Sequence, residues 1–144
     1  MENVALQEFV VETELNSNDG VASNKSRGII TNISADRDGK HAKAHSPVEV
    51  IIGALGSCFF INIQRYFQEK GEEISNSDVQ MILKGYRDPE IPKLVKIDYE
   101  VLINKELGFD PNKLKEFMEL GSTTYRTLES SVEISGKITR KDLT

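Results

Sequence analysis

The sequence predicts an α+β protein, and three of its features lead to that fold class. One long apolar helix is marked at both ends, segments rich in β-branched residues stand before and after it, and strands do not alternate strictly with helices. The chain has 144 residues, of which 38% are hydrophobic and 28% charged, as in an ordinary soluble globular protein. We therefore expect a single domain over residues 1–144.

Two strands are expected before the helix. Residues 4–15 and 27–33 are rich in β-branched side chains, and between them stands the pair Asp19-Gly20, which suits a hairpin turn with positive φ. Residues 35–45 are polar and turn-prone, which is typical of a loop or of the tip of a second hairpin.

The start of the long helix is the clearest local signal in the chain. Ser46 is placed as N-cap, Pro47 takes the first helical position, and Glu49, three residues after the serine, completes a capping box. Gly71 follows the last helical turn, so the predicted helix runs from Pro47 to Lys70. Its first half is apolar nearly all round, which indicates a central helix.

The second half of the chain predicts two more strands, two shorter helices and a final strand. The strands are expected at residues 78–88 and 94–103, and Asp110 before Pro111 opens a helix by the same cap-then-proline pattern. Gly121 interrupts that helix, Ser122 caps a third short one, and residues 132–138 form the last strand.

Charge and hydropathy exclude several classes of function. A net charge of −5 argues against a nucleic-acid surface, which needs clustered Lys and Arg. The longest apolar run, residues 48–61, is shorter than the roughly 20 residues of a membrane span, and the acidic N-terminus does not resemble a secretory signal. A lone cysteine forms no internal disulfide, so we expect a cytoplasmic protein.

Cys58, the single cysteine, admits two interpretations. Its helical neighbours Ala54 and Ile61 are apolar, and a buried free cysteine commonly serves as a small hydrophobic residue. As a reagent it must be a thiolate, which needs a positive neighbour or donated hydrogen bonds, and Asn62 is the one polar companion on its helix face. The sequence leaves both interpretations open.

The pattern Ser46-Pro-x-Glu, followed by Ala54-Leu-Gly-Ser-Cys58 on a long apolar helix, resembles the OsmC/Ohr family of osmotically inducible and organic-hydroperoxide-resistance proteins. The resemblance covers nearly the whole chain in element order. It implies an OsmC-like fold, in which antiparallel sheets wrap around a long central helix in an intertwined homodimer with active sites at the subunit interface. It also implies thiol peroxidase chemistry on organic hydroperoxides, with a dithiol as reductant.

The resemblance assigns roles to two residues of this chain. Cys58 matches the peroxidatic cysteine, and Glu49 lies where many OsmC-like members carry a glutamate; the position used by the hydroperoxide-resistance branch is Val48 here. As the acidic half of a capping box, Glu49 also has a sufficient structural role.

Other elements of the family pattern are missing. The second cysteine falls on Ser122, so this is an OsmC-like branch that lacks it, and the arginine of the early hairpin falls near Asn18. Arg27 and Arg37 are substitutes that no spacing favours over each other. Ser122 has a simpler interpretation as a helix cap.

These observations support two main hypotheses. The first is a one-cysteine thiol peroxidase, in which Cys58 reduces organic hydroperoxides and an external thiol resolves the sulfenic acid. The second is a non-catalytic dimer of the same fold that binds a small hydrophobic molecule at the subunit interface, with Cys58 as lining. A structural or regulatory dimer without a ligand is a third interpretation.

The histidines raise the question of a metal. His41 and His45 are spaced i,i+4, which binds zinc if the segment is helical. The surrounding glycine and lysines favour a solvated loop instead, so we expect no metal site and no cofactor.

Overall fold

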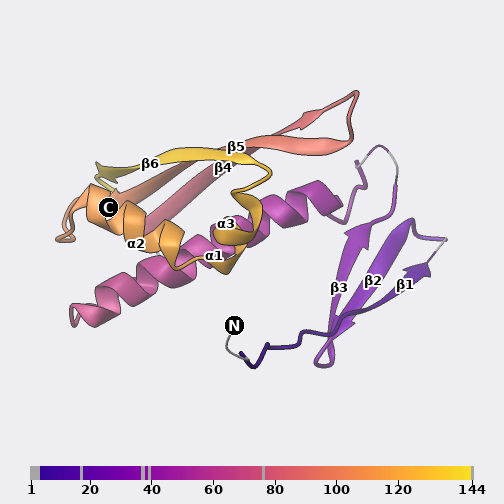
Figure 1. Ribbon diagram of the computed structural model, residues 1–144, viewed down its shortest axis with the longest axis horizontal. Helices are drawn as coiled ribbons and strands as arrows, with labels where there is room; N and C mark the ends of the chain where they lie inside the picture. The colour runs from indigo at the N-terminus through magenta and orange to yellow at the C-terminus, as the bar shows by residue number, and fades with distance from the viewer. Residues whose placement is uncertain (1–3, 17, 37, 39, 76, 144) are drawn as a thin grey trace. The chain divides into compact units, whose positions relative to one another are not determined.

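The computed structural model describes residues 4–143, apart from residues 17, 37, 39 and 76. The chain divides into two compact units, Met1–Val50 and Ile51–Thr144. Three strands precede the long helix, two strands and two helices follow it, and a strand ends the chain, which confirms the α+β class. The two units are drawn with the element labels used below (Figure 1).

The first unit is an antiparallel meander of three strands. They are β1 (Glu12–Asn16), β2 (Val21–Ser26) and β3 (Ile29–Ser34), in the order β1-β2-β3. Gly20 has φ +65°, as the predicted Asp19-Gly20 turn requires. A second turn places Arg27 and Gly28 at positive φ, which is the pattern of a two-residue hairpin.

The sequence prediction of this meander was wrong in two respects. Of the predicted strand 4–15 only residues 12–15 lie in a strand, β1, and residues 21–26, where no strand was predicted, form the middle strand. The segment VASNKS has a single β-branched residue, so composition did not reveal it. Pairing on both sides holds it in place, with Ser23 bonded to Asn32 at 3.0 Å and Thr13 bonded to Asn24 at 2.8 Å.

Helix α1 (Pro47–Glu69) begins and ends where its signals predicted, within one residue. The Ser46 backbone N–H donates to Glu49 Oε1 at 2.8 Å, and the Glu49 N–H donates to Ser46 Oγ at 3.2 Å, which is the reciprocal capping box. Gly71 follows with φ +78°, in the left-handed conformation that glycine adopts without cost.

Helix α1 is buried on one side only within the chain. Its buried residues are Leu55, Gly56, Phe59, Asn62, Ile63 and Phe67. On the remaining surface Ile61 is 61% exposed and Ile51 41%. By length and composition alone the helix is apolar enough to cross a membrane, although the core helix of a soluble protein passes the same test. This side of α1 therefore presents apolar side chains at the surface of the single chain.

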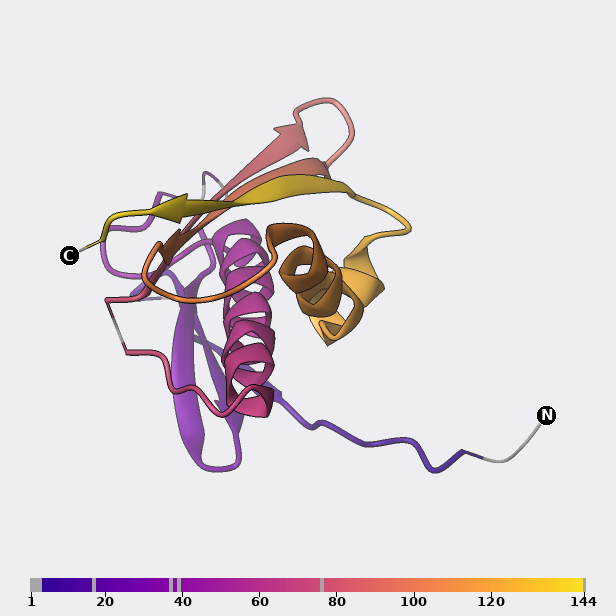
Figure 2. The ribbon, with the colours of Figure 1, turned by 90° about the vertical axis from the view of Figure 1, so that its left-hand side faces the viewer.

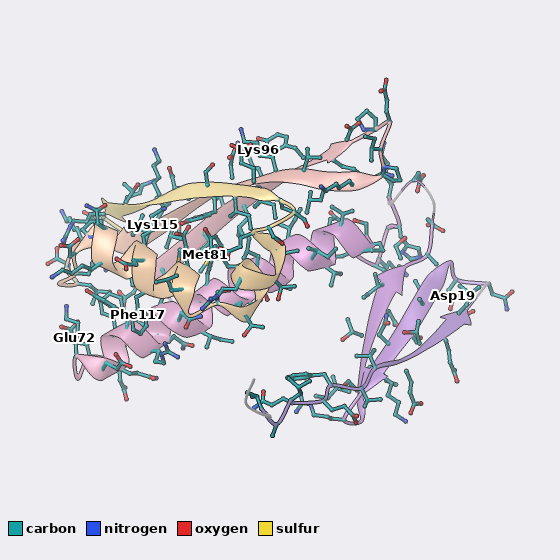
Figure 3. The ribbon with its side chains drawn as sticks, in the orientation of Figure 1. Asp19, Glu72, Met81, Lys96, Lys115 and Phe117 are labelled. Atoms are coloured by element: carbon teal, nitrogen blue, oxygen red, sulfur yellow. The ribbon has the colours of Figure 1, made fainter. Side chains whose placement is uncertain are left out.

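The second unit packs helices on one face of a sheet. Strands β4 (Val79–Asp88), β5 (Lys93–Asn104) and β6 (Glu133–Lys141) lie in the order β4-β5-β6, with β4 antiparallel and β6 parallel to β5. Helices α2 (Pro111–Leu120) and α3 (Thr123–Leu128) lie beside α1 under this sheet (Figures 1 and 2). Lys96 stands on the opposite, outer face (Figure 3).

The core of this unit lies between the sheet and the helices. Phe59, Ile63 and Phe67 of α1 are fully buried, as are Leu114 and Met118 of α2. The inward residues of β5, Ile97, Tyr99, Val101 and Ile103, complete the same cluster. This packing fixes the α1 face that carries Phe59, and therefore the position of Cys58 beside it.

Candidate functional site

Cys58 lies at the middle of α1, next to the fully buried Phe59, and is itself only partly buried. The Phe59 ring packs against Tyr99 at 4.9 Å and Tyr125 at 6.0 Å between ring centroids. Contacts with β5 and α3 therefore hold this turn of α1 on both sides. A sulfur at this position is neither sealed in the core nor fully open to solvent.

The turn between α2 and α3 approaches α1 closely beside Cys58. A Cβ atom on Gly121 would clash with the side-chain amide oxygen of Asn62, so only glycine allows this approach. The Asn62 side chain in turn donates from Nδ2 to the Cys58 carbonyl at 2.9 Å. Gly121 and Asn62 thus bring Ser122, the next residue, to the face of α1 that carries the cysteine.

Ser122 is fully buried and caps α3, as the sequence predicted. Its Oγ accepts a hydrogen bond from the Tyr125 backbone N–H at 3.0 Å. Because the oxygen is an acceptor for the cap, the hydroxyl hydrogen remains to be donated elsewhere.

Burial of the sulfur and polar groups at the start of α3 shift the pKa of the Cys58 thiol in opposite directions. Burial of the sulfur alone would raise the pKa of Cys58, since it disfavours the charged form. The Ser122 hydroxyl, the backbone N–H and hydroxyl of Thr124, and the Thr123 N–H outweigh burial together, so the pKa of Cys58 lies below its ordinary value. Neutral donors, not a cation, account for these contributions.

Sequence reasoning assigned Ser122 to a cap and missed Thr123 and Thr124 altogether. The signal that could have found them was the alignment of Ser122 with the missing second cysteine. In the structure Gly121, directly before Ser122, packs against Asn62 on the Cys58 face of α1. Burial raises the pKa of Cys58, and the Ser122 hydroxyl lowers it. Two hydroxyl-bearing residues directly after a cap also offer free backbone N–H groups, as the first turn of any helix does.

A tyrosine–glutamate pair fixes α2, and with it the turn beside Cys58. The Tyr99 hydroxyl donates to Glu119 Oε2 at 2.7 Å, and Lys115 approaches Glu119 Oε1 at 3.4 Å. Burial raises the pKa of Tyr99 well above its usual range, and the adjacent Glu119 raises it further. Tyr99 is therefore neutral at physiological pH and serves as a structural tie between β5 and α2.

A shallow cavity of about 380 Å³ lies beside the same turn. Its lining consists of Arg65, Lys113, Glu116, Phe117, Leu120 and Gly121. The Arg65 guanidinium stacks over the Phe117 ring at 4.8 Å, and Phe117 points from α2 toward α1 (Figure 3). Arg65 follows Cys58 by seven residues, which is two turns along the same side of the helix.

Glu49 is exposed in the capping box at the start of α1. The Ser46 backbone N–H, and after it the Ser46 hydroxyl, hold the pKa of Glu49 below its ordinary value, so it is ionised at neutral pH. It precedes Cys58 by nine residues, or two and a half helical turns, which puts the two side chains on opposite sides of α1.

The two histidines lie in a loop, not on a helix. His41 Nε2 bonds the Asp19 carbonyl at 2.7 Å, and its Nδ1 accepts from the Lys43 N–H at 3.0 Å. Both ring nitrogens are therefore engaged by backbone groups, while His45 pairs with Ile33 through the backbone. In the described part of the chain no group of three or more His, Cys, Asp or Glu residues could hold a metal ion.

The arginine of the family pattern has no clear counterpart. Asn18 is exposed after β1, as is Arg27 in the β2–β3 turn, where it has φ +52°. Arg37 lies outside the described residues.

Comparisons with known proteins agree with this architecture. An OsmC-like protein from Mycoplasma pneumoniae has 19% identity and a TM-score of 0.74, covering 93% of this chain and 97% of its own. The organic hydroperoxide resistance protein OsmC from Legionella pneumophila has 17% identity and a TM-score of 0.65, with 94% and 99% covered. The same protein type from Bacillus subtilis, OhrB, has 15% identity and a TM-score of 0.60, with 94% and 100% covered.

At these identities the structural likeness shows the fold alone. A search of curated protein sequences found no match. The profile described as OsmC-like protein, however, matches residues 39–137, which include the whole of α1, Cys58 and the α2–α3 turn. The chain therefore belongs to the OsmC-like family.

Proposed function

We propose that this protein is a cytoplasmic one-cysteine thiol peroxidase that reduces organic hydroperoxides in oxidative stress defence, with an external thiol as reductant. The observation that supports the proposal most directly is the setting of the Cys58 sulfur. It is partly exposed, and its pKa, which burial raises, is brought below the ordinary value by neutral groups of Ser122, Thr123 and Thr124. A thiolate is the nucleophile in peroxide reduction, and this setting favours one.

The proposed reaction has two stages. The Cys58 thiolate attacks the outer peroxide oxygen, the O–O bond breaks, and the products are a sulfenic acid and an alkoxide that takes a proton from water. One external thiol then displaces water to give a mixed disulfide. A second thiol releases Cys58 as thiol and leaves as the oxidised disulfide.

Glu49 enters the proposal as an assisting group. Its ionised, exposed carboxylate is able to pair with and orient an arginine at an active site. Because Glu49 and Cys58 point to opposite sides of one helix, we propose that Glu49 assists the site of the other subunit.

A homodimer is part of the same proposal. Within the chain α1 exposes Ile51 and Ile61, and β1 and β3 expose Leu15, Ile29 and Ile30. Apolar side chains spread over a helix and a sheet in this way suit burial against a second copy. Light scattering coupled to size exclusion will test this, and a monomer at micromolar concentration would contradict it.

The decisive experiment measures the rate at which Cys58 loses its thiol to cumene hydroperoxide and to hydrogen peroxide, by mass spectrometry, with Cys58→Ser as control. We expect oxidation well above the rate of a free thiol, faster with the organic peroxide and reversed by a dithiol. A rate equal to that of a free thiol would remove the peroxidase proposal.

The second candidate is a non-catalytic dimer that binds a small hydrophobic molecule at the subunit interface. Two observations favour it: Ser122 stands in place of a resolving cysteine, and the cavity beside Gly121 has the apolar lining of Phe117 and Leu120. An inert Cys58, together with saturable binding of an apolar fluorescent probe, would support this candidate.

A further inference from the structure

We propose that His41 is a pH-sensitive latch on residues 40–45, the segment that leads into α1. The neutral imidazole ring of His41 holds this segment in the conformation of the structure, and protonation of the ring releases the backbone of Lys43. The proposal concerns the first unit of the chain alone, so it neither depends on the peroxidase function proposed above nor fails with it.

The first step of the argument is the pair of backbone groups that contact the His41 ring. Nε2 lies 2.7 Å from the carbonyl oxygen of Asp19 in the β1–β2 turn (Figure 3), and Nδ1 lies 3.0 Å from the backbone nitrogen of Lys43. A carbonyl oxygen only accepts hydrogen bonds, so Nε2 carries a hydrogen. A backbone N–H only donates, so Nδ1 carries none. Both contacts are therefore satisfied only by the neutral ring with its hydrogen on Nε2.

The second step is the effect of a second ring proton. The imidazolium ion carries an N–H on both nitrogens. The bond from Nε2 to the Asp19 carbonyl is kept and becomes charge-assisted. At Nδ1 two N–H groups would point at each other, so the bond from the Lys43 N–H is lost. Protonation therefore breaks one of the two contacts and leaves the ring attached to the β1–β2 turn.

The third step is the place of the released backbone. On one side of it the ring is tied to the β1–β2 turn, and on the other side the His45 carbonyl accepts from the Ser34 N–H at 2.9 Å. Residues 42–44 lie between these two anchors and line a cavity of about 550 Å³. Release at Lys43 therefore changes the wall of this cavity while both ends of the segment stay anchored.

Charged and titratable groups from several elements lie around the His41 ring. They are Asp19 of the β1–β2 turn, Asp36 beside Gly20, Glu49 of α1, and Lys40, Lys43 and His45 of the segment itself. Carboxylates favour the charged ring and ammonium groups disfavour it, so together they set the pH of the transition. They do not change its direction: the Lys43 bond is present while the ring is neutral and is lost as the pH falls through the titration of the ring.

The test follows the His41 ring and the Lys43 amide by NMR in the full-length protein, between about pH 8 and pH 5, the range in which histidines titrate. His41→Asn is the matched variant, because an asparagine side-chain oxygen can accept from the N–H two residues later and does not titrate. His45→Asn, which removes the other histidine of the segment, is the control.

We expect the ring nitrogen shifts of wild-type His41 at pH 8 to be those of the Nε2–H tautomer. On acidification, hydrogen exchange protection of the Lys43 amide, corrected for the intrinsic effect of pH, should fall about fivefold in step with protonation of His41, as the loss of one hydrogen bond predicts. His45→Asn should behave like the wild type, and His41→Asn should keep its protection throughout.

Three results would overturn the proposal. They are an Nδ1–H tautomer at pH 8, a Lys43 protection that does not follow the protonation of His41, and an equal loss of protection on acidification in the wild type and in His41→Asn. The first two are measured on the wild type, so they decide the proposal even if His41→Asn loses the conformation of residues 40–45 at every pH.

Discussion

Ser46 and Ser122 are the same residue type in the same structural role, yet their surroundings differ. Each stands at the N-cap of a helix and accepts a hydrogen bond from a backbone N–H three residues later. The hydrogen bonds of Ser46 are solvent-exposed and are completed by Glu49 in a reciprocal box. Ser122 is fully buried and lies against the face of α1 that carries Cys58.

Burial gives the capping serine Ser122 a second role that the exposed Ser46 does not have. At Ser46, water can replace any bond that the protein does not make, so the serine contributes helix stability and nothing more. At Ser122, water is excluded, and the hydroxyl must donate within the protein. The consequence is chemical: burial raises the pKa of the Cys58 thiol, and the Ser122 hydroxyl is the first of the neighbouring groups that lower it.

Gly121→Ala is expected to have the largest effect on stability, because it disturbs the packed turn that carries the buried cap Ser122. The backbone at Gly121, with φ −83°, accepts any residue, but the added methyl group would meet the Asn62 amide and the Phe117 carbonyl. We expect a loss of about 2 kcal/mol in unfolding free energy, as overpacking causes. Urea unfolding measures it, and alkylation of Cys58 should slow as the turn moves away.

Gly108→Ala is the matched control, because a Cβ atom there meets nothing within 4 Å. It should leave both stability and alkylation unchanged. If Gly121→Ala and Gly108→Ala have the same unfolding free energy and the same rate of Cys58 alkylation, the α2–α3 turn is not tightly packed against Asn62.

The variants Ser122→Ala and Ser46→Ala measure how much more a buried cap contributes to stability than an exposed one. Each removes a cap, but Ser122→Ala also leaves the Tyr125 N–H without its partner in a part-buried site. We expect about 1.5 kcal/mol of destabilisation for Ser122→Ala and about 0.7 kcal/mol for Ser46→Ala, measured by urea unfolding. A larger cost for Ser46 would contradict the argument from burial.

Local signals predicted the helices of this protein almost residue by residue. Ser46, Asp110 and Ser122 are caps in the structure as the sequence indicated, and Gly71 ends α1. These signals depend on side chains that satisfy the backbone of their own turn, so they can be read without knowing the fold. The family resemblance was similarly carried by one contiguous helix.

The missed features depend on partners far away in the sequence. Strand β2 has a polar, weakly β-prone sequence and is fixed by its neighbours on both sides. The groups of Ser122, Thr123 and Thr124 that lower the pKa of Cys58 follow the α2–α3 turn, which packs against Asn62 of α1 at Gly121, more than 60 residues later in the chain than Cys58. The Cys58 neighbourhood therefore looked apolar along the helix, although the structure supplies hydroxyl and N–H groups from outside it.

The smallest expected effect concerns Glu49 in the exposed capping box of Ser46, and it is measured as a change in the pH dependence of the unfolding free energy. Because the folded-state pKa of Glu49 is depressed, the unfolded chain binds more protons near that pKa. The stabilisation is thus fully present above about pH 4.3, the ordinary value, and is lost as the pH falls through the folded value.

Glu49→Gln should accordingly lower the urea midpoint slightly at pH 7. As the pH falls toward 3, the urea midpoints of the variant and of the wild type should become equal. Glu72→Gln, which removes an equal charge outside the capping box, controls for net charge. Parallel curves for wild type and Glu49→Gln down to pH 3 would show that the carboxylate adds nothing to the cap. Ser46 would then act alone, as Ser122 does without an acidic partner, and burial alone would distinguish the two caps.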